Sequence, residues 1–286
     1  MILLRARAEF HGSTCGEPGF LGSALHGLVE RCVHQDGHDV EAVLGKGHDS
    51  WCRVLPPAID HVTSPMHFGI ALFGPARSKW SQLSLALQNR ARYLQSGEWR
   101  ARIERIAIDL HVPAGRDVVA CSPCGPELLA AQEWIPPSAV PAQGTEHLQI
   151  EFLTPVRLST SSKRRAGDGA PVPELQAIVR SAYRSVSVRM PSWLQTFADG
   201  DDMPALERQA RAAVALHDER AVPVRRWPHH RLPVKLYGRQ GILSWEGRFS
   251  APVLRLLELG QWVGVGQGTA MGLGGYRLVL PQARKQ

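Results

Sequence analysis

The sequence has few cysteines, few aromatic residues and no long hydrophobic run. Five cysteines are an odd number for a chain of 286 residues, and the first residues do not resemble an export signal, so we expect no disulfide framework. No run of about 18 apolar residues occurs, which predicts that the chain has no transmembrane helix. These absences favour a globular, cytoplasmic protein with no membrane partner.

Patterns for metal or nucleotide binding are also sparse. Cys121 and Cys124 form a single CxxC pair, and a structural zinc site needs two further ligands. The glycine-rich segment Gly264–Gly275 lacks the lysine of a phosphate-binding loop and does not open a Rossmann unit. The sequence therefore predicts no metal and no cofactor, and it argues against a nucleotide-dependent enzyme.

Positive charge is in moderate excess. The 33 lysines and arginines outnumber the 26 aspartates and glutamates, for a formal net charge of +7. Much of this excess is arginine, whose planar guanidinium makes forked contacts with phosphate. The composition favours a nucleic acid or another anionic partner.

Hydrophobic periodicity predicts an α+β fold built from two ferredoxin-like domains in tandem. Residues 1–140 form the first domain and residues 145–286 the second, which carries a helical insertion at about 173–217. A segment rich in proline between residues 113 and 147 is the predicted linker. The predicted strands are residues 2–10, 66–73, 106–112, 148–152, 243–249 and 276–280. The predicted helices are residues 21–33, 80–94, 173–190, 204–217 and 252–259, and residues 34–50 are predicted to be a loop.

The segment Gly264–Gly275 is the most distinctive of the chain, because six of its twelve residues are glycine. Glycine permits positive φ and close approach of a second backbone. A loop of this kind can offer successive amides to phosphate oxygens, although a tight connection within a sheet would use the same residues. The glycines predicted to contact a polyanion are Gly264, Gly266, Gly268, Gly272 and Gly274.

Three blocks together resemble the CRISPR-associated endoribonuclease family that cuts precursor CRISPR RNA, within the RAMP superfamily. They are Gly264–Gly275 with its flanks, Phe68–Gly74 before a long helix, and Gly19–His26 at the start of the first helix. The resemblance implies two ferredoxin-like domains, a glycine-rich loop that touches RNA, and metal-independent cleavage beside a repeat hairpin. It also implies a catalytic histidine near the first helix or in the loop after it.

The catalytic candidates gather in the first domain, where four histidines occur within 23 residues. Histidine ionises near neutral pH and can serve as base or acid when a 2′-hydroxyl attacks the adjacent phosphate. A zinc cluster and transition-state stabilisation by Arg31 or Arg53 are alternative readings. The candidates are His26, with Glu30 one helical turn away, His34, His38, Lys46 and His48.

Basic residues of the second domain are the candidates for RNA binding, because several occur in runs or at helical spacing. Arginine suits phosphate, and Trp227 near one run suits stacking with unpaired bases. Each run could equally be a solvated surface. The candidates are Lys163, Arg164, Arg165, Arg180, Arg184, Arg225, Arg226, Lys235 and Arg239.

Two functional hypotheses follow. In the first, the chain binds a CRISPR repeat stem-loop, cleaves precursor RNA without metal, and stays on the product within an effector complex that includes other CRISPR subunits. In the second, it is a non-catalytic RNA-binding subunit with the same fold in a CRISPR ribonucleoprotein. Cleavage of repeat RNA in the presence of EDTA distinguishes the two.

Overall fold

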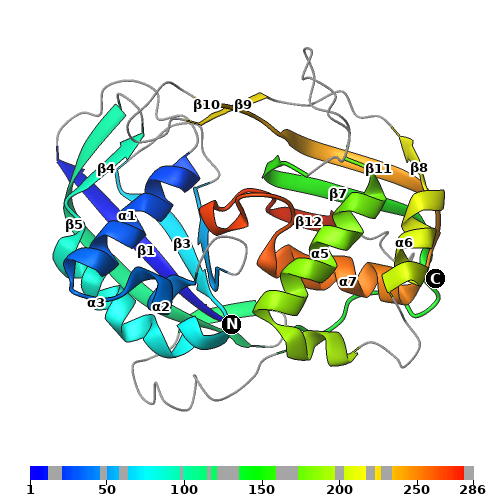
Figure 1. The fold of residues 1–286 in the computed structure, drawn as a ribbon, viewed down its shortest axis with the longest axis horizontal. Helices are drawn as coiled ribbons and strands as arrows, with labels where there is room; N and C mark the ends of the chain where they lie inside the picture. The colour runs from blue at the N-terminus through cyan, green and yellow to red at the C-terminus, as the bar shows by residue number, and fades with distance from the viewer. Residues whose placement is uncertain are drawn as a thin grey trace. The chain divides into compact units, whose positions relative to one another are not determined.

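The computed structural model contains two main antiparallel sheets, each with helices packed on one face (Figure 1). Alternating burial along the strands fits this arrangement, because successive side chains point to opposite faces of a sheet. The structure describes residues 1–11, 21–45, 50–57, 64–96, 99–114, 117–120, 135–158, 173–196, 203–216, 223–226 and 234–279.

The first sheet is built around β1, which pairs antiparallel with β3 on one side and β5 on the other. The strand order is β2-β3-β1-β5-β4, and β6 pairs with β5. The strands are β1 (Ile2–His11), β2 (Cys52–Leu55), β3 (Met66–Leu72), β4 (Tyr93–Ser96), β5 (Trp99–Ala114) and β6 (Asp117–Ala120).

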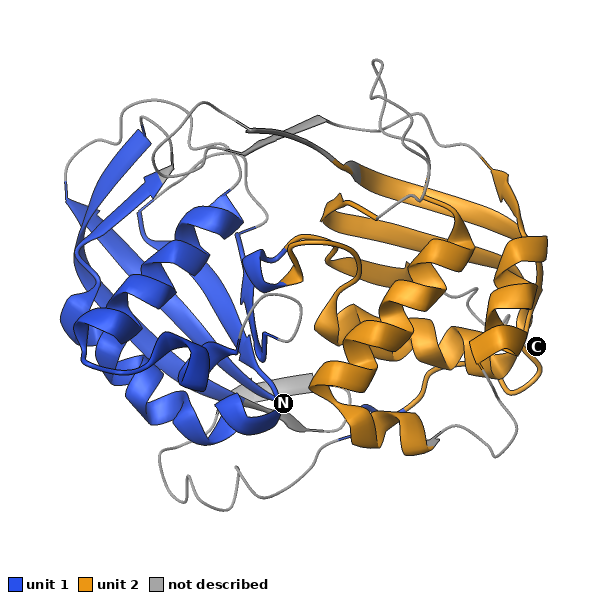
Figure 2. Cartoon of the chain, viewed as in Figure 1, with its two compact units in different colours: residues 1–137, 224–236, 270–272 blue, residues 138–223, 237–269, 273–286 orange. Residues whose placement is uncertain are grey.

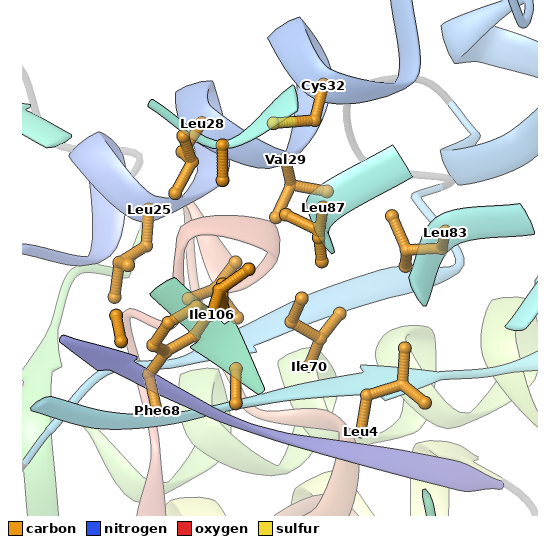
Figure 3. Close-up of a cluster of buried hydrophobic side chains, with 14 of the residues drawn as sticks. Leu4, Leu25, Leu28, Val29, Cys32, Phe68, Ile70, Leu83, Leu87 and Ile106 are labelled. Atoms are coloured by element: carbon orange, nitrogen blue, oxygen red, sulfur yellow. The ribbon is translucent and has the colours of Figure 1, made fainter. Parts of the chain in front are cut away.

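Helices α1 (Leu21–Gln35) and α3 (Trp80–Arg90) cover one face of this sheet. The apolar stripe predicted to begin at Leu21 is buried along the whole of α1, as its 3.6-residue period requires. Figure 3 shows side chains of α1, among them Leu25 and Val29, meeting Ile70 and Ile106 of the sheet. The short elements α2 (Val40–Leu44) and the 3-10 helix η2 (Gly74–Lys79) complete this layer.

The second sheet has the order β12-β7-β11-β8, and its printed pairs are antiparallel. Helices α5, α6 and α7 pack on one face, where Ile150 and Phe152 of β7 are buried. Its elements are β7 (Thr145–Val156), α5 (Leu175–Arg189), the 3-10 helix η3 (Pro191–Thr196), α6 (Met203–Ala212), β8 (Val214–Leu216), β11 (Arg239–Phe249), α7 (Ala251–Val263), the 3-10 helix η4 (Thr269–Met271) and β12 (Tyr276–Val279).

The chain divides into two compact units, coloured separately in Figure 2. The first unit comprises Met1–Pro137, Val224–Leu236 and Ala270–Gly272; the second comprises the remaining residues. Strands β9 (Pro223–Arg226) and β10 (Val234–Tyr237) pair with each other in a small sheet of their own.

Several sequence-based boundaries were wrong. Residues 34–50 were expected to be one loop, but α1 continues to Gln35 and residues 40–44 form α2. Leu94 was assigned to the second helix, which ends at Arg90, and Leu94 lies in β4. The predicted helix at 204–217 ends at Ala212 and is followed by β8. In each case a connection of one to four residues separates the two elements.

Among the described residues, no helix is long and apolar enough to cross a membrane. The same part of the chain holds no group of three or more histidine, cysteine or acidic side chains placed to bind a metal ion. The CxxC pair at Cys121 and Cys124 lies outside the described residues.

Candidate functional site

The glycine-rich loop, residues Gly264–Gly275, connects the end of α7 to β12. Helix α7 ends at Gly264, whose amide donates to the carbonyl of Gly260 at 2.8 Å. Five of the loop's glycines have positive φ, a conformation that side chains with a Cβ rarely adopt. They are Gly264, Gly266, Gly268, Gly272 and Gly274, with φ between 65° and 88°.

The loop is held in place at both ends by hydrogen bonds from its own amides. The acceptors belong to α5, to β7 and its last residues, and to the loop itself, so the two ends have a fixed path. The bonds, donor first, are Val265 to Gly274 O, Gly266 to Ser181 Oγ, Gln267 to Arg157 O, Gly274 to Pro155 O and Gly275 to Thr154 Oγ1, with lengths of 2.7–3.0 Å.

The packing leaves no space for side chains at two of these glycines. A Cβ on Gly274 would lie 1.6 Å from the carbonyl oxygen of Val265, and a Cβ on Gly266 would lie 2.4 Å from that of Arg157. These contacts are with backbone, which cannot move aside as a flexible side chain does. Glycine is therefore required here by both φ and space.

A buried arginine supports the middle of the loop. Arg189, in the last turn of α5, is 2% exposed, and its Nη2 donates to Thr269 Oγ1 at 2.8 Å. Thr269 opens the 3-10 helix η4 and is itself buried. A bond from a charged donor inside the protein is stronger than one between neutral groups, so this contact fixes the position of η4.

The accessible part of the loop is short. Gly264 and residues 272–275 are buried, whereas residues 266–268, Ala270 and Met271 are half-buried. At the two ends of the loop the amides bond to the protein, as a tight connection within a sheet requires. The half-buried residues 266–268 and 270–271 are the accessible part of the loop.

The described histidine candidates lie on or just after α1. His26 Nδ1 is 3.5 Å from Glu30 Oε2, one turn along the helix, and its side chain is 18% exposed. His34, expected in a loop, is an exposed residue in the last turn of α1. Eight helical residues separate these two histidines by about 12 Å along the axis and about 80° around it, so they do not form a close pair.

His38 follows the helix end and has a different neighbour. Gly37, with φ of 83°, turns the chain so that the His38 amide donates to Val33 O at 3.1 Å. This is the bonding of a glycine-based helix C-cap. His38 Nε2 then lies 3.7 Å from Asp36 Oδ2. The other two candidates of this cluster, Lys46 and His48, lie outside the described residues.

The two arginines considered as alternatives for catalysis differ in accessibility. Arg31 is half-buried on α1 and its Nη2 donates to Tyr93 O at 3.4 Å. Arg53, on β2, is 3% exposed. A ligand can approach the Arg31 guanidinium more readily than that of Arg53.

Helix α5 carries the RNA-binding candidates whose side chains are described. Arg180 and Arg184 are both exposed, but only Arg180 is paired, through two bonds to the carboxylate of Glu207 on α6. Hydrogen bonds from Arg180 and Gln176 lower the pKa of Glu207 to about 2, and the same pair raises the pKa of Arg180. Within the described residues Arg184 forms no ion pair.

The remaining basic candidates are only partly described. Lys163, Arg164 and Arg165 lie outside the described residues. The other four have a described backbone: Arg225 and Arg226 are in β9, Lys235 in β10 and Arg239 in β11.

The sequence analysis missed Arg189 as a support of the loop. It singled out Arg180 and Arg184 of the same helix but assigned no role to Arg189. The buried positions of α5 include Ala182, Val186 and Arg189, which recur at helical spacing. Extending that stripe by one turn would have predicted that Arg189 points inward.

Comparison with known families matches one part of the chain. Residues 150–276, which include the loop and its supports on α5 and β7, match the model of the CRISPR-associated endoribonuclease Cas6. This part of the chain is therefore similar to the Cas6 family. A search of curated protein sequences finds no match.

Solved structures with the same fold include Cas6 proteins over nearly their full length. A Cas6 product complex is 18% identical with a TM-score of 0.59, covering 97% of this chain and 99% of that chain. Thermus thermophilus Cas6 is 14% identical with a TM-score of 0.56, covering 98% of each chain. An RAMP protein binding different RNA substrates is 12% identical with a TM-score of 0.52, covering 98% and 100%. The predicted α+β fold with tandem ferredoxin-like domains is thus confirmed.

Proposed function

We propose that this chain is a metal-independent endoribonuclease that binds a CRISPR repeat stem-loop and cleaves precursor CRISPR RNA at its base. The observation that carries the proposal is the family match over residues 150–276, which contains the anchored glycine-rich loop. We assign the first domain, residues 1–140, to catalysis and the second, residues 145–286, to binding of the stem-loop.

In the proposed reaction the RNA supplies its own nucleophile. The 2′-oxygen attacks the neighbouring phosphorus, the bond from phosphorus to the 5′-oxygen breaks, and the leaving oxygen takes a proton. The products are a 2′,3′-cyclic phosphate and a 5′-hydroxyl. A base for the 2′-hydroxyl, an acid for the leaving oxygen and a cation for the phosphorane are the three aids required.

His26 is the first candidate for one of the proton transfers. Its ring is partly exposed, and Glu30 Oε2 lies 3.5 Å from Nδ1. A carboxylate one helical turn away can orient the ring, which leaves the other ring nitrogen for the RNA. Because His34 is two turns away, the second transfer falls to another of the candidates, His38, Lys46 or His48. Arg31 is the candidate for charge stabilisation.

For binding, residues 266–268 and 270–271 of the loop approach the sugar–phosphate backbone of the stem-loop. Arg184 and Arg180 extend this contact along α5, with Arg180 exchanging Glu207 for a phosphate. The basic residues Lys163, Arg164, Arg165, Arg225, Arg226, Lys235 and Arg239 contribute further phosphate contacts. The product stays bound through the stem-loop and is passed to other CRISPR subunits.

The test uses end-labelled repeat RNA incubated with the purified protein in EDTA. The proposal predicts cleavage to a cyclic phosphate, and intact but bound RNA when the scissile nucleotide is 2′-deoxy. A requirement for divalent metal would contradict the proposed chemistry.

A second candidate function is RNA binding without cleavage. The separation of His26 from His34 along α1 favours it, because a binding subunit needs no paired acid and base. Tight binding of repeat RNA with no cleavage, under any ionic condition, would establish this alternative.

A further inference from the structure

The first sheet has one face against the helices and one face that points away from them, which we call the open sheet face. Alternation assigns residues to it directly, because Ile2, Leu4 and Ala6 of β1 are buried in the core while Arg5 and Arg7 between them are exposed. Its charged, histidine and aromatic members on β1, β3, β4 and β5 are Arg5, Arg7, Glu9, His11, His67, Tyr93, Arg100, Arg102, Arg105 and Asp109.

Strand register brings these side chains into adjacent rows. Residues that are opposite each other in an antiparallel pair share a face. His67 lies opposite Arg7. Arg102 has two such partners, His11 on β1 and Tyr93 on β4. Arg105 lies opposite Glu9, and a register shift between Glu9 and Phe10 then places Arg102 opposite His11.

The open sheet face is rich in arginine and poor in compensating charge. Its five arginines on β1 and β5 are exposed, whereas Arg53 on β2, which the register places on the same face, is buried. The nearby carboxylates are those of Glu9, Asp109 and the bulged residue Glu104. Arg7 pairs with Glu9 at 3.0 Å. Within the described residues, Arg5, Arg102 and Arg105 form no ion pair, so these three guanidinium groups are available to a ligand.

One aromatic ring lies among these arginines. Tyr93 is 43% exposed, and the guanidinium carbon of Arg100 lies 4.1 Å from its ring centroid. An exposed ring on a sheet, flanked by arginines, suits stacking with an unpaired base while the arginines hold phosphates. A base-paired stem hides the faces of its bases and cannot use this ring.

We propose that the open sheet face binds single-stranded RNA, namely the unpaired segment next to the stem-loop. The inference rests on the proposed function for the identity of the RNA. It adds a second RNA contact on the first unit, with Arg5, Arg102 and Arg105 on phosphates and Tyr93 on a base.

The experiment compares two RNAs and two triple variants by fluorescence anisotropy at several salt concentrations. One RNA is a single-stranded oligonucleotide of the flank, and the other is a blunt repeat stem-loop with a 2′-deoxy scissile nucleotide. The test variant is R5Q/R102Q/R105Q. The control, R90Q/R208Q/R248Q, removes the same charge from exposed arginines elsewhere.

The test variant should bind the single strand about tenfold more weakly, with a log–log salt slope smaller by about 2, because three phosphate contacts are lost. Its affinity for the stem-loop should match that of the control. Tyr93→Leu should weaken single-strand binding about fivefold or more and leave the salt slope unchanged. The triple lysine variant R5K/R102K/R105K should keep the slope, which excludes misfolding as the cause.

Unchanged single-strand binding in the test variant, as expected if this face takes an acidic protein, would overturn the inference. Equal losses for both RNAs would also overturn it. If the wild type binds the single strand but not the stem-loop, the proposed function is contradicted while the inference about the open sheet face is supported. If it binds neither RNA, both fail.

Discussion

The two units share a strand order but present different surfaces. In both sheets the first strand in chain order lies between the third and a later strand, as β2-β3-β1-β5 in one and β8-β11-β7-β12 in the other. The face turned away from the helices carries five exposed arginines in the first unit. In the second unit its described charges are Glu151, Glu246 and Arg277, and Arg277 is paired with Glu151.

This contrast shows that the fold does not determine the chemistry of the outward sheet face. Buried apolar residues alternate along the strands of both sheets because each sheet must pack on helices, whereas packing does not constrain the residues on the outward face. The overall excess of basic residues gave no information about which unit carries an open basic sheet. The second unit instead offers α5 and the glycine-rich loop apart from Ala270–Gly272, which belong to the first unit. In our proposals, the open sheet face and this loop bind different parts of one RNA.

The largest effect on stability is expected from a substitution in the glycine-rich loop. Gly274→Ala would place a Cβ 1.6 Å from Val265 O at a φ of 65°. We expect a loss of at least about 3 kcal/mol in unfolding free energy, measured with urea, because backbone must move. Gly37→Ala, with φ of 83° but nothing within 4 Å, is the control and should cost about 1 kcal/mol. Equal losses would show that space at Gly274 does not matter.

The next effect tests whether catalysis belongs to the first unit. His26→Ala should slow cleavage about 100-fold or more, as expected for removal of a proton-transfer group, with stem-loop affinity unchanged. The control is His147→Ala in the second unit, whose Nδ1 lies 3.9 Å from Glu246 Oε1. A single-turnover assay separates chemistry from binding. Full activity in His26→Ala would remove this residue from the mechanism.

A smaller effect tests the support of the loop by Arg189. Thr269→Val keeps the shape of the side chain but removes the acceptor of a buried bond from Arg189. We expect a loss of about 2 kcal/mol in stability and weaker stem-loop binding. Thr269→Ser keeps the hydroxyl and should retain both. If valine and serine variants bind RNA equally well, the bond does not position the loop.

The smallest expected effect concerns the arginines of α5. Hydrogen bonds hold the pKa of Glu207 at about 2, below its ordinary value of 4.5. The contribution of the ionised carboxylate to folding stability is therefore present above pH 4.5 and is lost as pH falls toward 2. The pair is on the surface, so that contribution is small. Glu207→Gln removes the charge that pairs with Arg180, so that Arg180 can bind phosphate. The variant should raise stem-loop affinity about twofold at low salt. Glu146→Gln, with the same charge change in the same unit, should leave affinity unchanged, and equal effects would argue against a role for Arg180.

Long periodic segments were predictable from the sequence, and short edge strands were not. The stripe from Leu21 gave α1, and Pro252 marked the start of α7, although that helix continues past its predicted end near Leu259 to Val263. Strands β2, β4 and β8 have only three or four residues, which is too short for an alternating pattern to stand out. Gly37 is a typical residue after the end of a helix. Because the residues around it are polar, the sequence favoured a loop from residue 34 where the last residues of α1 lie.

The candidate site was predictable in position but not in detail. The spacing of glycines located the loop, but its anchors Ser181 and Thr154 are 85 and 121 residues away in the chain. Likewise, alternation predicted that Arg5 and Arg7 share a face. Only the strand register, with its shift between Glu9 and Phe10, shows that Arg102 and Arg105 lie on the same face. No local sequence pattern predicts that register.

The central claim is that the glycine-rich loop and the open sheet face hold different parts of one RNA, and photocrosslinking tests it most directly. A repeat RNA with 4-thiouridine either in the stem-loop or in its single-stranded flank is crosslinked to the wild-type protein, and the attached peptides are identified by mass spectrometry. The account predicts that the stem-loop attaches to residues 266–271 and the flank to peptides containing Tyr93 or Arg102. Stem-loop crosslinks on the first sheet, with none at the glycine-rich loop, would contradict it.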